Sequence, residues 1–170
     1  MKNKKITLWT WKRPRRYYFT HPKTFLKDVI WNVKNMRQRM NRGFSASDVF
    51  DFNEWFLTVI PNALRYLSEN GLAYPGREPY DTEEKWENHL NYLADEIEAC
   101  KDNSEEYVNQ YQKEFDDWMK TNPNEREETF QDKIIKRKYM DREIEITNQK
   151  AQRLKNALCQ LADDMPFLWD

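Results

Sequence analysis

The stretch Pro22–Gly43, PKTFLKDVIWNVKNMRQRMNRG, decides the fold class of this chain. Apolar residues recur along it at intervals of three and four positions, namely Leu26, Val29, Val33, Met36 and Met40. This spacing places them on one face of an α-helix. Proline suits the first position of a helix, and glycine commonly ends one, so Pro22 and Gly43 mark its two ends. The stretch therefore predicts one amphipathic helix.

Helical patterns continue toward the C-terminus. A further helix is predicted over 51–70, with a kink or break at Pro61. Another begins at Asp81 and carries Trp86, Leu90, Leu93 and Ile97 on one face. A last helix is predicted over 130–161. The 170 residues include only three glycines, whereas the tight turns of sheet proteins recruit many. Aromatic residues make up 15% of the chain, which excludes general disorder. We expect an all-α fold, a bundle of about four to five helices with a basic, partly extended N-terminal arm and a long C-terminal helix.

The length fits a single helical domain that spans 1–170. Within it we distinguish a basic aromatic arm (1–21), core helices (22–100), an acidic helical insertion (101–150), and a C-terminal helix with a docking tail (151–170).

Charge is distributed unevenly along the chain. Residues 1–50 carry 13 Lys and Arg against two acidic residues, Asp28 and Asp48, which gives +11. The remainder carries 15 basic and 27 acidic residues, which gives −12. Such polarity predicts either a basic end that meets an anion or two ends that meet each other, within the fold or in a homo-oligomer.

No motif of an enzyme active site is present, so we predict a protein that is not an enzyme and uses no cofactor. His21 and His89 are the only histidines, and neither stands in a zinc-binding spacing, so no metal site is expected. Cys100 and Cys159 are predicted to be buried free thiols. With no secretory leader and no membrane-spanning stretch, a cytoplasmic location follows, with no membrane partner.

Basic and aromatic residues alternate in the arm, where Trp11 and Arg15 stand within WKRPRRYY. Guanidinium groups grip phosphate, and aromatic rings stack on bases, so this segment is typical of a nucleic-acid or nucleotide contact. The alternative is an arm that packs its tryptophans on the core and leaves its charges in water.

A second candidate cluster surrounds the turn after Gly43, with Arg37, Arg39, Arg42, Phe44 and Ser45. These residue types suit a phosphodiester, but ordinary helix capping with solvated cations would produce the same pattern. Tyr74 forms a third candidate. It precedes Pro75 in a loop, where it could close over a ligand or simply pin the loop to the core.

Several segments together resemble a widespread group of small helical proteins from tailed bacteriophages. The resemblance rests on RMNRGFSASD (39–48), the helix 52–67, GLAYP (71–75), the helix 86–97 and the ending FLWD (167–170). It covers about 20–100 and the last 20 residues. Ala46 replaces the usual acidic residue, Phe50 stands where Trp is common, and 101–150 is an enlarged insertion.

The resemblance implies a non-enzymatic anti-defence protein that sequesters a cyclic nucleotide signal of host immunity in the host cytoplasm. Such a sponge protein would be a homo-oligomer with a cyclic oligonucleotide as its ligand. The ligand-binding residues expected from it are Arg39, Arg42, Phe44, Ser45 and Tyr74, followed by Arg37, Trp11 and Arg15. Two alternatives stay open: a phage accessory protein that binds nucleic acid through its basic arm, and an inhibitor or adaptor that binds a host protein.

Overall fold

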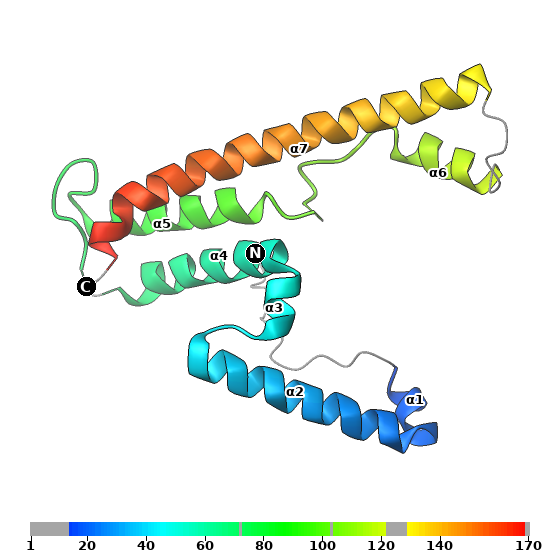
Figure 1. The fold of residues 1–170 in the computed structure, drawn as a ribbon. Coiled ribbons are helices and arrows are strands. Elements are labelled where there is room, and N and C mark those ends of the chain that lie inside the picture. Colours follow the sequence, from blue (N-terminus) through cyan, green and yellow to red (C-terminus); the bar gives the residue numbers. More distant parts are fainter. Residues whose placement is uncertain (1–13, 72, 103, 122–128, 169–170) are drawn as a thin grey trace. The chain divides into compact units, whose positions relative to one another are not determined.

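A computed structural model describes residues 14–71, 73–102, 104–121 and 129–168, and within these ranges the fold is all-α, as predicted (Figure 1). The described α-helices are α1 (Arg15–Thr20), α2 (Pro22–Arg42), α3 (Ala46–Phe50), α4 (Phe52–Asn70), α5 (Glu83–Glu98), α6 (Gln112–Thr121) and α7 (Phe130–Asp164), followed by the short 3-10 helix η1 (Met165–Phe167). The contacts group into two compact units, 1–62 and 63–170, and each is described by itself.

The bounds of α2 agree with the prediction from its sequence. Pro22 occupies the first turn, and Gly43 ends the helix in the left-handed conformation, with its N–H donated to the carbonyl of Arg39 at 2.8 Å. The helix α4 runs through Pro61 without a break. The part of the N-terminal arm that the structure describes is helical, since it forms α1. Residues 1–13 of the arm lie outside the described ranges.

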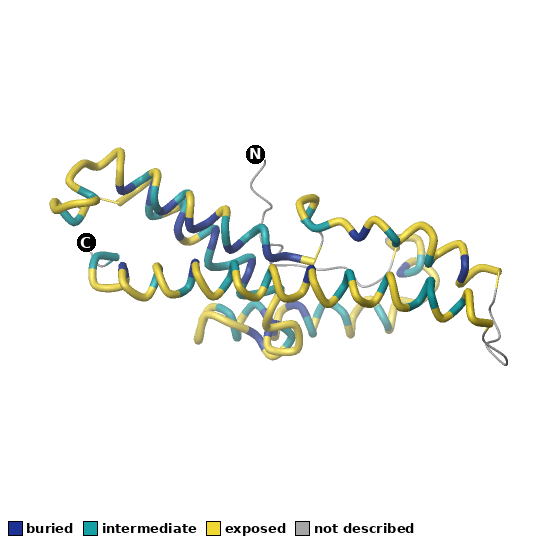
Figure 2. The backbone as a smooth tube through the Cα atoms, turned by 90° about the horizontal axis from the view of Figure 1, so that it is seen from above, coloured by how far each residue is buried: buried dark blue, intermediate teal, exposed yellow. Residues whose placement is uncertain are grey.

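The buried face of α2 differs from the predicted apolar stripe. Leu26, Val33 and Met40 are 58%, 47% and 79% exposed, whereas the buried residues of α2 are two polar ones, Asn32 and Asn35. Periodicity identifies the residues that share a face, but only the packing of neighbouring elements decides which face is covered. Figure 2 shows where buried and exposed positions fall along the backbone. On α2, the residues that line a cavity shared with α3 include the polar Lys34, Asn35 and Gln38.

The second unit is organised along α7. The helix α5 buries Trp86, Leu90, Leu93 and Ile97 on one face, as its sequence pattern predicts. It contacts one part of α7, and α6 contacts another (Figure 1). The guanidinium of Arg153 on α7 binds both carboxylate oxygens of Glu96 on α5, at 2.9 and 2.6 Å.

Two aromatic contacts hold the ends of this unit. The rings of Phe115 on α6 and Tyr139 on α7 stack with centroids 4.2 Å apart. In the C-terminal tail, the ring of Phe167 lies under the guanidinium of Arg77, 4.3 Å from its centroid. Cys100 is a buried free thiol, but Cys159 is exposed, so its predicted burial is wrong: it lies on a face of α7 that faces solvent.

The left-handed backbone conformation of Gly43 predicts how substitutions at this position change the stability of the protein. Its φ is +78°, and a Cβ added there would meet no atom within 4 Å, so Gly43→Ala costs only backbone strain. We expect a loss of about 1 kcal/mol in the free energy of unfolding. Gly43→Asn should lose less, because asparagine adopts this conformation more readily. Urea titrations of the three proteins measure this, and equal losses for the two variants would contradict the explanation.

Candidate ligand-binding site

The turn between α2 and α3 is closed by reciprocal hydrogen bonds. Ser45 caps α3, and its backbone N–H donates to Oδ2 of Asp48 at 2.7 Å, which forms a capping box. Ser45 is fully buried, and its Oγ lies 2.7 Å from Oγ of Ser47. A bond from α2 completes the closure, as the N–H of Ala46 donates to Oε1 of Gln38 at 2.8 Å.

An ion pair fastens α3 to α2 at this turn. Arg39 donates from Nε and Nη2 to the two carboxylate oxygens of Asp48, at 2.9 and 2.5 Å. The pair is bidentate and mostly buried, the stronger arrangement for such a contact. Arg39 lowers the pKa of Asp48 to about 2, against the opposing effect of burial and with help from the hydrogen bonds of Ser45.

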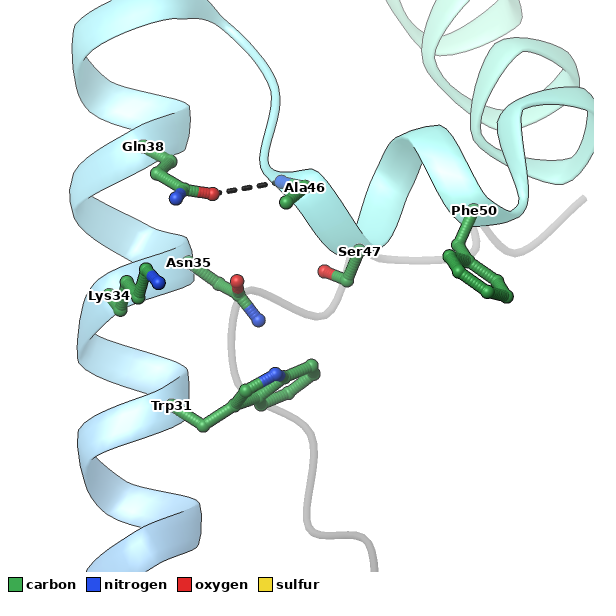
Figure 3. Close-up of a pocket in the computed structure, with 7 residues that line it drawn as sticks. All are labelled: Trp31, Lys34, Asn35, Gln38, Ala46, Ser47 and Phe50. Atoms are coloured by element: carbon green, nitrogen blue, oxygen red, sulfur yellow. Dashed lines mark hydrogen bonds between the residues drawn. The ribbon is translucent and has the colours of Figure 1, made fainter.

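A cavity of about 420 Å³ lies between the two helices. It is lined by Trp31, Lys34, Asn35 and Gln38 of α2 and by Ala46, Ser47 and Phe50 of α3 (Figure 3). Asn35 and the indole of Trp31 project from α2 on the side of α3, and Phe50 stands at the end of α3 that is farther from α2 (Figure 3). Because Phe50 is 96% exposed, its ring is accessible from solvent.

A second cavity of about 380 Å³ continues along α2. It is lined by Lys34, Arg37, Gln38, Asn41 and Arg42, so it shares two residues with the first. We call the two adjoining cavities the α2–α3 notch. Its cations are Lys34, Arg37 and Arg42, and they make no ion pair with any other residue that the structure describes. The guanidinium of Arg42 lies over the ring of Phe44, 5.3 Å from its centroid.

One polar group in the notch lacks a partner. Nδ2 of Asn35 is buried and makes no hydrogen bond within the described part of the chain. Buried amide groups in folded proteins are nearly always paired, and an unpaired one is costly. The notch therefore combines two aromatic rings, three cations and an unsatisfied hydrogen-bond donor.

The predicted site residues divide into distinct groups. Arg37 and Arg42 line the notch, whereas Arg39 and Ser45 hold the turn that forms it. Phe44 stands beside the notch through its contact with Arg42.

Three further predicted residues are Tyr74, Trp11 and Arg15. Tyr74 belongs to the second unit, in the loop between α4 and α5, and is half exposed. Trp11 and the side chain of Arg15 lie outside what the structure describes.

Sequence reasoning missed Trp31, Lys34 and Asn35. The sequence signal for Asn35 is that a second asparagine, Asn32, precedes it by three residues in the interior of an amphipathic helix. The periodicity carries no comparable signal for Trp31 or Lys34. Asparagine is a weak helix former, so two in one helix interior were a clue to a local requirement.

The second unit holds a cluster of titratable groups around His89. Its Nε2 lies 2.6 Å from Oδ2 of Asp164 and 3.0 Å from the hydroxyl of Tyr80. Burial, followed by the charge of Asp164, raises the pKa of Tyr80, which makes its phenolate less accessible as a nucleophile. The cluster joins the loop before α5 to the end of α7, so we interpret it as structural.

Neither a metal site nor a membrane span is found in the described ranges. No group of three or more His, Cys, Asp or Glu side chains there could hold an ion. No described helix is long and apolar enough to cross a bilayer. Comparison of the chain with protein-family models, curated proteins and solved structures finds no match, so the resemblance to phage proteins stays a prediction.

The ion pair at the turn makes stability depend on pH. The pKa of Asp48 is about 2 in the folded protein against 3.8 in the unfolded chain, so folding favours the carboxylate. Its contribution is therefore complete above about pH 4 and is lost as the pH falls toward 2. We expect Asp48→Asn to unfold with about 1–2 kcal/mol less free energy at pH 7, and with nearly wild-type free energy at pH 2.

Urea unfolding at pH 7, 4 and 2 measures this dependence. Asp163→Asn, at an exposed position of α7, serves as the matched control and should change little at any pH. A deficit of Asp48→Asn that stays constant from pH 7 to pH 2 would exclude the proposed role of the ion pair.

Proposed function

We propose that this protein is a non-enzymatic binder of a small phosphorylated nucleotide, which it holds in the α2–α3 notch. The observation that carries the proposal is the meeting of Lys34, Arg37 and Arg42 with the aromatic rings of Trp31 and Phe50 along one surface. Guanidinium and ammonium groups bind phosphate oxygens, and aromatic rings stack on bases. A nucleotide presents both groups within one small molecule.

The electrostatics of the notch favour an anion. None of the described residues that line it is acidic, and the nearby carboxylate of Asp48 is paired with Arg39. A doubly negative ligand thus meets uncompensated positive charge at short range, without a competing carboxylate. Because the cations are exposed, the attraction should weaken as salt concentration rises.

The residues of the notch also support binding without a reaction. Its described lining includes the hydroxyl of Ser47 and the amine of Lys34, but no imidazole or carboxylate of a described residue stands there to act as their general base. This agrees with a protein that sequesters its ligand and releases it unchanged. As the biological setting we propose the host cytoplasm during phage infection, with a cyclic oligonucleotide immune signal as the ligand, since the sequence resemblance implies it.

A second candidate function is the binding of single-stranded nucleic acid. Lys23, Lys27 and Lys34 are exposed on α2 at intervals of four and seven residues, so they form a row beside the notch. Such a row could follow a phosphate backbone. A polymer that contacts several phosphates loses affinity steeply with salt, whereas a single nucleotide loses it modestly.

We expect a cyclic di- or trinucleotide to raise the melting temperature of the purified protein. A ligand at 100 times its Kd adds about 2.7 kcal/mol to the free energy of unfolding. Linear nucleotides and a short single-stranded DNA are compared, and chromatography of the recovered ligand tests whether it stays intact. Arg37→Gln should weaken binding about tenfold, because it removes a charge-assisted contact to phosphate.

The matched control is Lys27→Gln, which removes an exposed cation of the same helix that does not line either cavity. It should bind the nucleotide as the wild type does. If no nucleotide shifts the melting temperature, the proposal is wrong. If Lys27→Gln and Arg37→Gln weaken DNA binding equally while nucleotides have no effect, the second candidate replaces it.

A further inference from the structure

Asn35 occupies an unusual position for a buried amide. Its side chain is on the face of α2 that meets α3, and the residue is only 5% exposed. Figure 3 shows the amide directed into the cavity, between the indole of Trp31 and the hydroxyl of Ser47. Nδ2 nevertheless has no hydrogen-bond partner among the described residues.

Other helical asparagines of this chain show that the helix itself offers a partner. Asn32 donates from Nδ2 to the carbonyl of Asp28, four residues earlier, at 2.8 Å. The same bond to the fourth preceding carbonyl is made by Asn62 at 2.7 Å, Asn70 at 3.0 Å and Asn91 at 3.0 Å. Asn35 could turn back to Trp31 in this way, but its amide faces the cavity instead.

The surroundings of the amide limit what could satisfy it. The nearby hydroxyl of Ser47 already lies at hydrogen-bonding distance from Ser45, and Oε1 of Gln38 accepts from Ala46. Neither oxygen is hydrogen-bonded to Nδ2, so the acceptor that pairs with it is one that enters the cavity, on a water molecule or on a ligand. A flat heterocycle with acceptor atoms on its edge can stack on an aromatic ring of the cavity wall, whereas a bare phosphate gains nothing from such a ring.

We propose that Asn35 is the residue that reads the edge of a nucleobase in the α2–α3 notch. Nδ2 donates to a ring nitrogen or carbonyl of the base, and Oδ1 accepts from a neighbouring N–H of the same edge. An asparagine amide pairs with a base edge in this two-point manner because both carry a donor beside an acceptor. Lys34, Arg37 and Arg42 then face the phosphate. This inference rests on the proposed function and adds that the ligand must carry a base.

If this assignment is right, replacing Asn35 raises the stability of the unliganded protein and lowers its affinity for nucleotide. The variant Asn35→Leu removes a buried donor that has no partner and keeps a similar volume. The unliganded variant should melt at the same temperature as the wild type or higher. Its affinity for nucleotide should fall about tenfold or more, since the bond to the base is lost. A residue with a merely structural role would not raise stability and lower affinity together.

The matched control is Asn32→Leu, one turn away on the same helix. It removes an amide whose bond to Asp28 is made, so its melting temperature should fall while its affinity for nucleotide stays that of the wild type. Asn35→Ala serves as a second variant of Asn35, which removes the amide without adding a branched side chain.

The experiment measures binding of a cyclic dinucleotide, AMP, GMP, CMP, UMP and ribose 5-phosphate to each protein by calorimetry. We expect the nucleotides to bind the wild type at least about tenfold more tightly than ribose 5-phosphate, and this margin to vanish in Asn35→Leu and Asn35→Ala. The order of the four monophosphates identifies the base. If ribose 5-phosphate binds as tightly as the nucleotides, or if both Asn35 variants keep full affinity, Asn35 does not recognise the base. Phosphate binding in the notch would still stand. No binding of any of these compounds overturns the proposed function as well.

Discussion

The ion pair between Arg39 and Asp48 is the contact on which the proposed ligand-binding surface depends. The two residues stand on different helices, and their paired hydrogen bonds set α3 against α2 on the far side of a short turn. The turn needs a left-handed residue at Gly43 and a capped start of α3 at Ser45. Together these contacts hold the turn beside which the cavity lined by Trp31 and Phe50 lies.

The same ion pair shapes the electrostatics of the notch. Arg39 neutralises the carboxylate of Asp48, and the cations Lys34, Arg37 and Arg42 make no ion pair with another described residue. Arg39 is thus a supporting residue, although its position in a basic cluster favoured a direct contact with ligand. An Arg–carboxylate pair of this geometry leaves the guanidinium little freedom to bind a second anion.

In the second unit, buried polar groups are paired across the fold. Arg153 is bound by Glu96, Asn109 donates to the carbonyl of Tyr139 at 3.1 Å, and His89 lies against Asp164. Each of these contacts joins segments distant in the sequence, and the buried polar atoms have partners. This contrast makes the unpaired amide of Asn35 informative, because the chain elsewhere satisfies groups of the same kind. We interpret the second unit as a scaffold and the notch in the first as the site of recognition.

The sequence by itself determined the fold class and the ends of the principal helices. Three- and four-residue spacing, the proline at 22, the glycine at 43 and the apolar face of α5 are local properties, and a helix forms from local hydrogen bonds. It also indicated that the basic turn after α2 was of interest. Three features were decided only by tertiary structure. They are the covered face of α2, the exposure of Cys159, and the support that Arg39 and Ser45 give to the notch. These features depend on contacts between residues nine or more positions apart or on different helices, and the periodicity of a single helix contains no information about them.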